Sequence, residues 1–152
     1  MSDIQEKFFS LLRYSLLAVE TDLKIKDGEW PGIFALSERH SLLGVIFHGI
    51  KNNGVKPPQA VFYQWLSYSE HIRALNMKVN EVAFEVTRLF EQNGFRSCIL
   101  KGQGNALSYP DPYSRTPGDI DIWVKPEGNG KSKKEDVRRA VTSFVQSYMV
   151  TV

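Results

Sequence analysis

The fold is decided by Ile99-Leu-Lys-Gly-Gln-Gly104 and by Arg115-Thr-Pro-Gly-Asp-Ile-Asp-Ile-Trp-Val124, which follows after a short interval. The first stretch predicts an apolar strand that runs into a glycine-rich turn, and the second predicts a strand with two alternating aspartates. Because successive side chains of a strand point to opposite faces, we expect Asp119 and Asp121 to project from the same face. Two carboxylates beside a turn rich in backbone N–H groups predict a place for a metal ion and a phosphate.

Length and composition limit the class of protein. A chain of 152 residues fits one domain, or a small domain with a helical appendage. Hydrophobic residues make up 42% and charged residues 24%, which is typical of a soluble globular protein. The formal net charge of +2 does not indicate nucleic acid as a partner. The single cysteine, Cys98, excludes an internal disulfide, fits a reducing cytosol, and is expected to be a small buried residue.

The N-terminal stretch from Phe8 to Val19 is apolar, as a targeting segment would be. Arg13 interrupts it, and the acidic residues Asp3 and Glu6 precede it. A signal peptide has a basic start and an uninterrupted apolar segment, and a membrane span needs about 20 apolar residues. We therefore expect a cytoplasmic protein without a membrane partner.

Apolar residues at three- and four-residue spacing predict helices over most of the first 94 residues. We expect a first helix from a capping box at Ser2 to a break at Asp27-Gly28. A second helix should open at Trp30-Pro31, and a third should cover residues 41–50, with two glycines that permit close packing. The longest pattern runs from Pro58 to Gly94, either as one helix about 50 Å long or with a break near Asn76.

The remainder alternates between short strands and helices. Strands are expected over residues 95–100 and 119–124, with a short helix over 102–107 and an irregular, proline-containing segment over 109–114. A last helix should begin at a cap on Ser132, and Tyr148–Val152 has the composition of a strand.

The order of these elements resembles a known family. A strand, a glycine turn, a loop with an arginine and an Asp-apolar-Asp strand resemble the polymerase-beta-type nucleotidyltransferase superfamily. More closely, Leu100-Lys-Gly102, Arg115 and Gly118-Asp-Ile-Asp-Ile-Trp-Val124 are similar to a family of uncharacterised bacterial nucleotidyltransferases. The resemblance implies an α+β fold, with a helical lobe and long connecting helix over residues 1–94. A nucleotidyltransferase-like α/β core with a short mixed sheet is then expected over residues 95–152.

The resemblance also implies a chemistry. In such folds the two aspartates, here Asp119 and Asp121, bind a divalent metal, usually Mg²⁺ (or Mn²⁺), and are catalytic. The backbone of the glycine turn, here Gly102, Gln103 and Gly104, holds nucleotide phosphates. Lys101 and Arg115 are the cations available to meet the phosphate charge. The expected activity is transfer of a nucleoside monophosphate from a nucleoside triphosphate to an acceptor hydroxyl.

A third carboxylate completes the site in the superfamily, on a later strand. The candidate strand here, Tyr148–Val152, contains no acid. The sequence therefore predicts either a core that is incomplete at the C-terminus or a non-catalytic module that binds a nucleotide or a partner protein on the same fold. Fold does not select the acceptor, the preferred nucleotide or the oligomeric state.

Simpler interpretations exist for each candidate residue. Asp119 and Asp121 alternate as solvent-facing residues of an edge strand also do. Lys101 can equally lie at the surface at a strand end, and Arg115 can form a structural ion pair with Asp111 or Asp119. The three histidines lie on separate predicted helices, which argues against a shared metal site.

Overall fold

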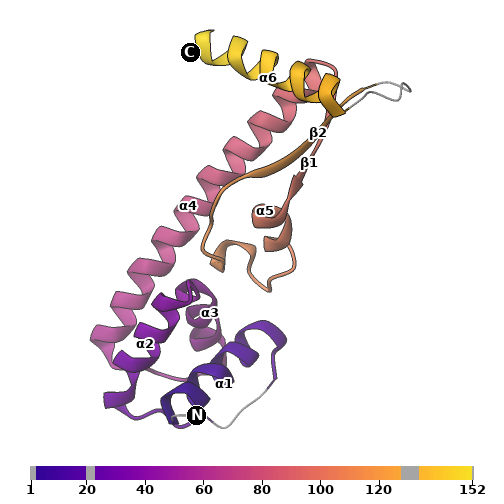
Figure 1. Cartoon of the computed structure of the whole chain (residues 1–152). Coiled ribbons are helices and arrows are strands. Elements are labelled where there is room, and N and C mark those ends of the chain that lie inside the picture. Colours follow the sequence, from indigo (N-terminus) through magenta and orange to yellow (C-terminus); the bar gives the residue numbers. More distant parts are fainter. Residues whose placement is uncertain (1–2, 20–22, 128–133, 152) are drawn as a thin grey trace.

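The chain is built along one long helix. The computed structural model of the protein describes residues 3–19, 23–127 and 134–151. Helix α4 (Gln59–Gln92) has 34 residues and spans about 51 Å at 1.5 Å per residue. Three shorter helices gather at one end of α4, and a two-stranded sheet and the last helix lie toward its other end (Figure 1).

The three N-terminal helices and the first half of α4 form a helical lobe. Its helices are α1 (Asp3–Leu17), α2 (Trp30–Arg39) and α3 (Leu43–Asn53), and a 3₁₀ turn (Asp27–Glu29) precedes α2. Trp30 and Trp65 are fully buried at its centre, with their rings edge to face at 6.1 Å. The Trp65 indole N–H donates to the Leu43 carbonyl oxygen at 2.9 Å, so this large side chain is buried without an unpaired polar atom.

Helix α1 ends ten residues before the predicted break at Asp27-Gly28. Ala18 has a φ of +52°, and its N–H donates to the Tyr14 carbonyl oxygen at 2.9 Å, which is a left-handed helix termination. The apolar spacing that continues to Val19 therefore does not extend the helix. The predicted cap at Ser2 lies outside the described residues.

The two glycines of α3 lie where other elements approach closely, as predicted. A Cβ atom on Gly49 would lie 2.0 Å from Ser15 Oγ of α1. A Cβ atom on Gly44 would lie 2.3 Å from the Ser114 carbonyl oxygen, far inside van der Waals contact. Helix α3 thus touches α1 with one glycine and a loop from the second half of the chain with the other.

Helix α4 is continuous, so a break near Asn76 does not occur. Its buried residues follow one stripe along its length at spacings of four or seven residues, as expected for one face of a helix. They are Trp65, Ile72, Asn76, Ala83 and Phe90. The first of these belong to the lobe core, whereas Phe90 packs against Phe95 of the sheet at a ring distance of 5.9 Å.

The sheet consists of β1 (Phe95–Leu100) and β2 (Asp121–Pro126), paired antiparallel. Strand β1 has the predicted bounds, whereas β2 begins two residues after the predicted start at Asp119. Leu100 pairs with Asp121, and β1 then turns into α5 (Lys101–Ala106), so Asp119 has no strand opposite it. Cys98, opposite Trp123, is exposed rather than buried, because it lies on the uncovered face of the sheet.

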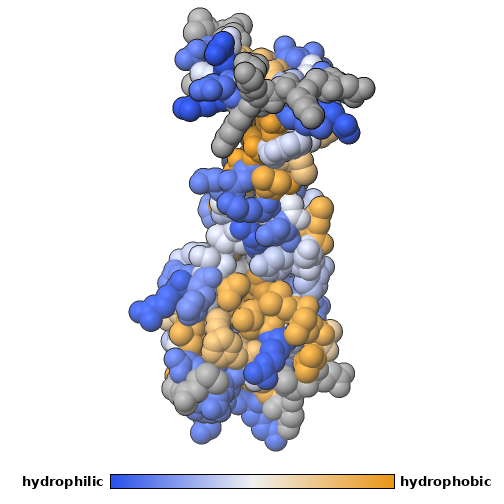
Figure 2. Space-filling view, turned by 45° about the vertical axis from the view of Figure 1, so that its right-hand side comes forward, coloured by the Kyte–Doolittle hydropathy of each residue, from blue (hydrophilic) through white to orange (hydrophobic). Residues whose placement is uncertain are grey.

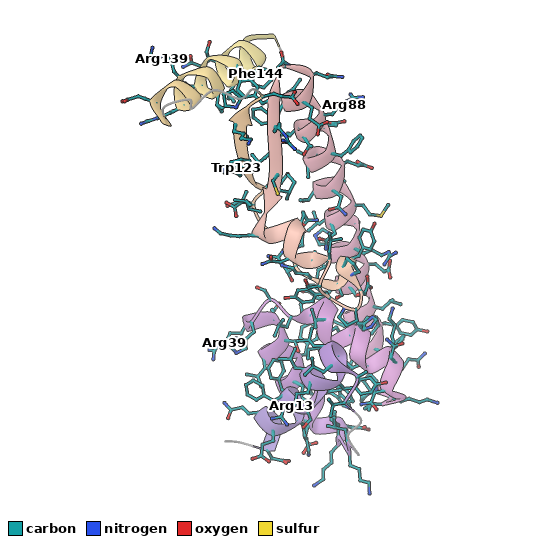
Figure 3. All side chains as sticks on the ribbon, turned by 90° about the vertical axis from the view of Figure 1, so that its right-hand side faces the viewer. Arg13, Arg39, Arg88, Trp123, Arg139 and Phe144 are labelled. Carbon is teal, nitrogen blue, oxygen red and sulfur yellow. The ribbon has the colours of Figure 1, made fainter. Side chains whose placement is uncertain are left out.

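The C-terminal segment is helical where a strand was expected. Helix α6 covers Lys134–Thr151, which includes nearly all of Tyr148–Val152. Once a helix has formed, each further residue adds one backbone hydrogen bond to it. The strand propensity of the last five residues is context-dependent and is outweighed by the gain from extending α6. Phe144 of α6 packs against Phe90 at a ring distance of 5.3 Å, which ties this helix to the end of α4 (Figure 3).

The predicted α+β class is confirmed, with mostly helical structure; the sheet of the described residues is a single antiparallel pair and not the mixed sheet that was predicted. Figure 2 shows apolar residues gathered over the lobe on one face, whereas the end that carries α6 is mainly hydrophilic. Among the described residues, every helix is too short or too polar to cross a membrane.

Candidate functional site

The predicted site lies between the lobe and the sheet, where β1 ends in the glycine turn (Leu100–Gly104). Lys101 and Gly102 have φ angles of +36° and +30°, and Gly102 interrupts the helical geometry of α5. A Cβ atom on Gly102 would lie 3.1 Å from the Asp119 carbonyl oxygen. Glycine is suited to this position for two reasons: its φ is positive, and the backbone of the aspartate segment passes close by.

The two aspartates are both solvent-exposed, and exposed residues alternate with half-buried ones from Asp119 to Pro126. Asp121 stands at the first ladder position of β2, and its Oδ2 lies 3.6 Å from Lys101 Nζ. Both side chains of this pair reach solvent, so the ion pair is weakly stabilising. A predicted metal ligand and a predicted phosphate ligand are therefore neighbours, although Asp121 begins β2 and Lys101 follows β1, 20 residues earlier in the sequence.

Asp119 and Asp121 can supply only some of the ligands that a divalent metal ion needs. Across the described residues, no three side chains of His, Cys, Asp or Glu come together as a metal cluster. Mg²⁺ usually keeps several waters and is bound through one or two carboxylates together with substrate phosphates. Asp119 and Asp121 fit that mode of binding, in which the nucleotide supplies further ligands.

Arg115 is carried by a loop, here called the arginine loop (Asp111–Thr116), that is anchored to the lobe. Its 3₁₀ turn (Pro112–Ser114) is capped by Asp111, whose Oδ1 accepts from the Tyr113 N–H at 3.0 Å. Ser114 is buried against Gly44 of α3, and Thr116 Oγ1 donates to the Ser41 carbonyl oxygen at 2.8 Å. The loop is thus held by the lobe, not by the strands that flank it in the sequence.

The Arg115 side chain does not form the ion pair that was considered for it. No carboxylate of the described residues lies within ion-pair distance of Arg115; Arg73 instead lies 3.8 Å from Asp111 and stacks over the Tyr113 ring at 4.7 Å. Arg115 Nη1 is buried and has no hydrogen-bond partner among the described residues. A buried charged donor without an acceptor is costly, and an anion at this position would satisfy it.

Asn76 of α4 links the glycine turn to the arginine loop. It is 1% exposed, and its Nδ2 donates to the carbonyl oxygens of Tyr113 at 3.1 Å and Arg115 at 2.7 Å. Its Oδ1 accepts from Gln103 Nε2 at 3.4 Å. Sequence reasoning missed this role, although one signal was present: a polar residue occupies a core position of the α4 stripe.

The predicted site residues thus meet in two groups. The first group joins Lys101 to Asp121 and Gly102 to the backbone of Asp119. The second joins Gln103 to the backbone of Arg115 through Asn76. Gly104 packs closely on the Ile99 carbonyl oxygen of β1, where a Cβ atom would lie at 3.1 Å, so a glycine at this position lets the turn fold back on the strand.

Comparison with known proteins identifies the family. A family model described as uncharacterised nucleotidyltransferase matches residues 26–134, a stretch that contains α2 to β2 and all the predicted site residues. The chain matches no curated protein and no solved structure. The chain therefore belongs to this uncharacterised nucleotidyltransferase family, as its sequence predicted. Its wider placement in the polymerase-beta-type superfamily and in bacteria stays a prediction.

Proposed function

We propose that this family member is a metal-dependent enzyme that transfers a nucleoside monophosphate from a nucleoside triphosphate to an acceptor hydroxyl. The observation that carries the proposal is the meeting of the glycine turn with the aspartate segment, at Lys101–Asp121 and Gly102–Asp119. Nucleotidyl transfer needs mainly positioned charge around the phosphates, and this meeting brings anionic, cationic and backbone groups together. The proposed compartment is the cytoplasm, where the exposed free thiol of Cys98 would stay reduced.

Asp119 and Asp121 are the proposed ligands of Mg²⁺ or Mn²⁺. Both carboxylates are exposed and within reach of a nucleotide arriving from solvent. When bound, the ion neutralises triphosphate charge and lowers the pKa of an attacking hydroxyl. Because the described chain supplies two carboxylates and no third ligand, we expect the metal to bind far better with a nucleotide than alone.

Lys101, Arg115 and the backbone of Gly102, Gln103 and Gly104 are the proposed phosphate ligands. The Lys101–Asp121 pair is exposed, so it can open at small cost when a metal takes the carboxylate and a phosphate takes the ammonium group. Arg115 has a buried nitrogen without a partner, and its planar fork can donate two parallel hydrogen bonds to phosphate oxygens.

A second candidate function is a module that binds a nucleotide or a partner protein without turnover. One observation favours it: residues 148–151, in the segment expected to form the strand of a third carboxylate, are the last residues of helix α6. The two candidates share the nucleotide-binding residues and differ only in whether product forms.

Calorimetry with each of the four ribonucleoside triphosphates and excess Mg²⁺ tests the proposal. We expect at least one nucleotide to bind, and Asp119→Asn or Asp121→Asn to weaken binding at least about tenfold, or about 1.4 kcal/mol. Asp27→Asn, an exposed aspartate of the lobe, is the matched control and should bind normally. Wild-type protein that binds no nucleotide would refute both candidates in their nucleotide-binding form, whereas binding without any labelled product would favour the module.

A further inference from the structure

Both the nitrogen and the oxygen of the Asn76 side-chain amide have hydrogen-bond partners, although the residue lies in the middle of a long helix. Besides its bonds to Tyr113 and Arg115, Nδ2 lies 3.0 Å from the Ile72 carbonyl oxygen of its own helix. Its Oδ1 faces Gln103. An amide has two N–H donors and one oxygen acceptor, and here each of them has a partner although the side chain is 1% exposed.

An apolar residue would suit this position better for helix stability alone. Asparagine has lower helix propensity than leucine or methionine, and burying an amide costs free energy unless its hydrogen bonds are made. The neighbouring stripe positions, Ile72 and Ala83, are apolar and buried. Asn76 therefore makes hydrogen bonds where an apolar residue would pack in the core. Its partners are the Gln103 side chain and the carbonyl oxygens of Tyr113 and Arg115.

We propose that Asn76 is a positioning residue for phosphate binding. Asn76 holds the Arg115 carbonyl oxygen and, together with Asn80 one turn further along α4, it holds the Gln103 side chain; it thereby helps to set the distance between the glycine turn and the Arg115 guanidinium group. This inference rests on the proposed function of the site and adds to it a residue from α4, about 25 positions before the glycine turn in the sequence.

The arginine loop has other anchors, which separates a positioning role from a purely structural one. Ser114 packs on Gly44, Thr116 bonds to Ser41, and Arg73 contacts Asp111 and Tyr113. Loss of the Asn76 amide should therefore leave the loop on the lobe and shift the Arg115 side chain from its position. The expected result is weaker phosphate binding in a folded protein.

A double-mutant cycle with Mg²⁺ and inorganic tripolyphosphate tests this role. We expect Asn76→Ala to weaken binding about tenfold in wild type and less than about twofold in an Arg115→Ala background, because neighbours that act together are not additive. Binding is followed by phosphorus NMR up to millimolar protein, so that the weak variants are measurable. The same fold-loss in both backgrounds, or no loss in wild type, would overturn the inference.

A stability control separates the two explanations further. Ala83→Gly alters a buried α4 position that forms none of the side-chain hydrogen bonds by which α4 holds the arginine loop and the glycine turn. It should lower the melting temperature, since glycine is a poor helix residue, and leave tripolyphosphate affinity unchanged. If Ala83→Gly weakens binding as much as Asn76→Ala does, the effect is one of general stability and the inference is wrong.

Hydrogen–deuterium exchange on wild-type protein decides the question if Asn76→Ala does not fold. On addition of Mg²⁺ and tripolyphosphate, we expect slower exchange in α4 peptides over residues 72–80 as well as in residues 101–116. Protection of residues 101–116 with no change over 72–80 would overturn the role of Asn76 while preserving the proposed function. Wild-type protein that binds neither tripolyphosphate nor any nucleotide would instead refute the proposed function, and this inference with it.

Discussion

Tryptophan side chains are buried in the helical lobe but exposed on the sheet at the other end of the molecule. Trp30 and Trp65 are completely buried in the lobe, where aromatic rings and a hydrogen bond to the Leu43 carbonyl surround Trp65. Trp123 on β2 is 48% exposed and lies on the face of the sheet turned away from α4 (Figure 3). The lobe has a buried core enclosed by four helices, whereas the two-stranded sheet has one covered face and one open face.

This difference shows why the candidate site lies where the two regions meet. The lobe holds the arginine loop through α3 and α4, and the exposed aspartates lie just before β2 (Asp119) and at its start (Asp121). Charged ligands for an incoming nucleotide must be accessible, and they must also be held in place. The lobe thus holds the arginine loop in place, and the open side of the sheet leaves the aspartates accessible to solvent.

The largest expected effect is the loss of a lobe tryptophan. Trp65→Ala should lower the free energy of unfolding by about 3–5 kcal/mol, because it removes a fully buried ring and leaves a cavity. Urea denaturation followed by circular dichroism measures this change. The matched variant Trp123→Ala should change it by less than about 0.5 kcal/mol, as is usual for surface substitutions. Equal losses in the two variants would remove the distinction between the buried lobe core and the open face of the sheet.

A smaller effect is expected where the lobe meets the arginine loop. Gly44→Ala should cost about 1–3 kcal/mol of stability, because its Cβ would lie 2.3 Å from the Ser114 carbonyl oxygen and the backbone must shift. It should also weaken nucleotide binding, since Arg115 follows Ser114. Denaturation and calorimetry together measure both effects.

Gly49→Ala provides the comparison for this variant. It crowds Ser15 of α1, with a Cβ–Oγ distance of 2.0 Å, and the three atoms nearest to the new Cβ all belong to α1 rather than to the arginine loop. It should therefore destabilise the lobe while nucleotide affinity stays normal. A fall in affinity in Gly49→Ala, or none in Gly44→Ala, would contradict the assignment of the loop to the lobe.

On the sheet side, substitution of an exposed cation should affect binding and not stability. Lys101→Met removes the 3.6 Å pair with Asp121, and an exposed pair of this kind contributes about 0–1 kcal/mol. We expect a melting temperature within about 2 °C of wild type and a clear loss of nucleotide affinity. Unchanged affinity would mean that Lys101 is only a surface residue.

The smallest effect concerns a charge cluster that ties α1 to the turn before α2. Lys7 Nζ lies 2.8 Å from Asp3 and 2.7 Å from Glu29; these contacts lower the carboxyl pKa values and raise the pKa of Lys7. Their stabilisation is complete between about pH 5 and pH 10, lost in acid as the carboxylates protonate, and lost in alkali as Lys7 deprotonates. Lys7→Met should therefore lower the melting temperature slightly at pH 7 and not at pH 2.

The sequence predicted the elements that depend on local patterns. Residues 95–100 form the expected strand, and α2 begins at Trp30-Pro31 as predicted. Apolar spacing and turn residues act over a few positions, so a single sequence displays them directly.

The failures have a different physical origin, because each depends on a partner distant in sequence. The start of β2 is set by where β1 ends at Leu100, and the exposure of Cys98 depends on an uncovered sheet face. The role of Asn76 depends on carbonyl groups 37 and 39 residues away. In the sequence, the only sign of these long-range contacts is a polar residue, Asn76, at a position of α4 where the helical pattern predicts an apolar one.

Electron paramagnetic resonance of Mn²⁺ tests most directly whether the two aspartates form a metal–nucleotide site. The free-ion signal should change little when protein alone is added, because the described chain offers two carboxylates and no third ligand. With the best-binding nucleotide present, wild-type protein should shift the spectrum to that of a ternary complex, and Asp121→Asn should abolish the shift. A spectrum identical to that of the Mn²⁺–nucleotide complex without protein, or an unchanged shift in Asp121→Asn, would contradict the proposed site.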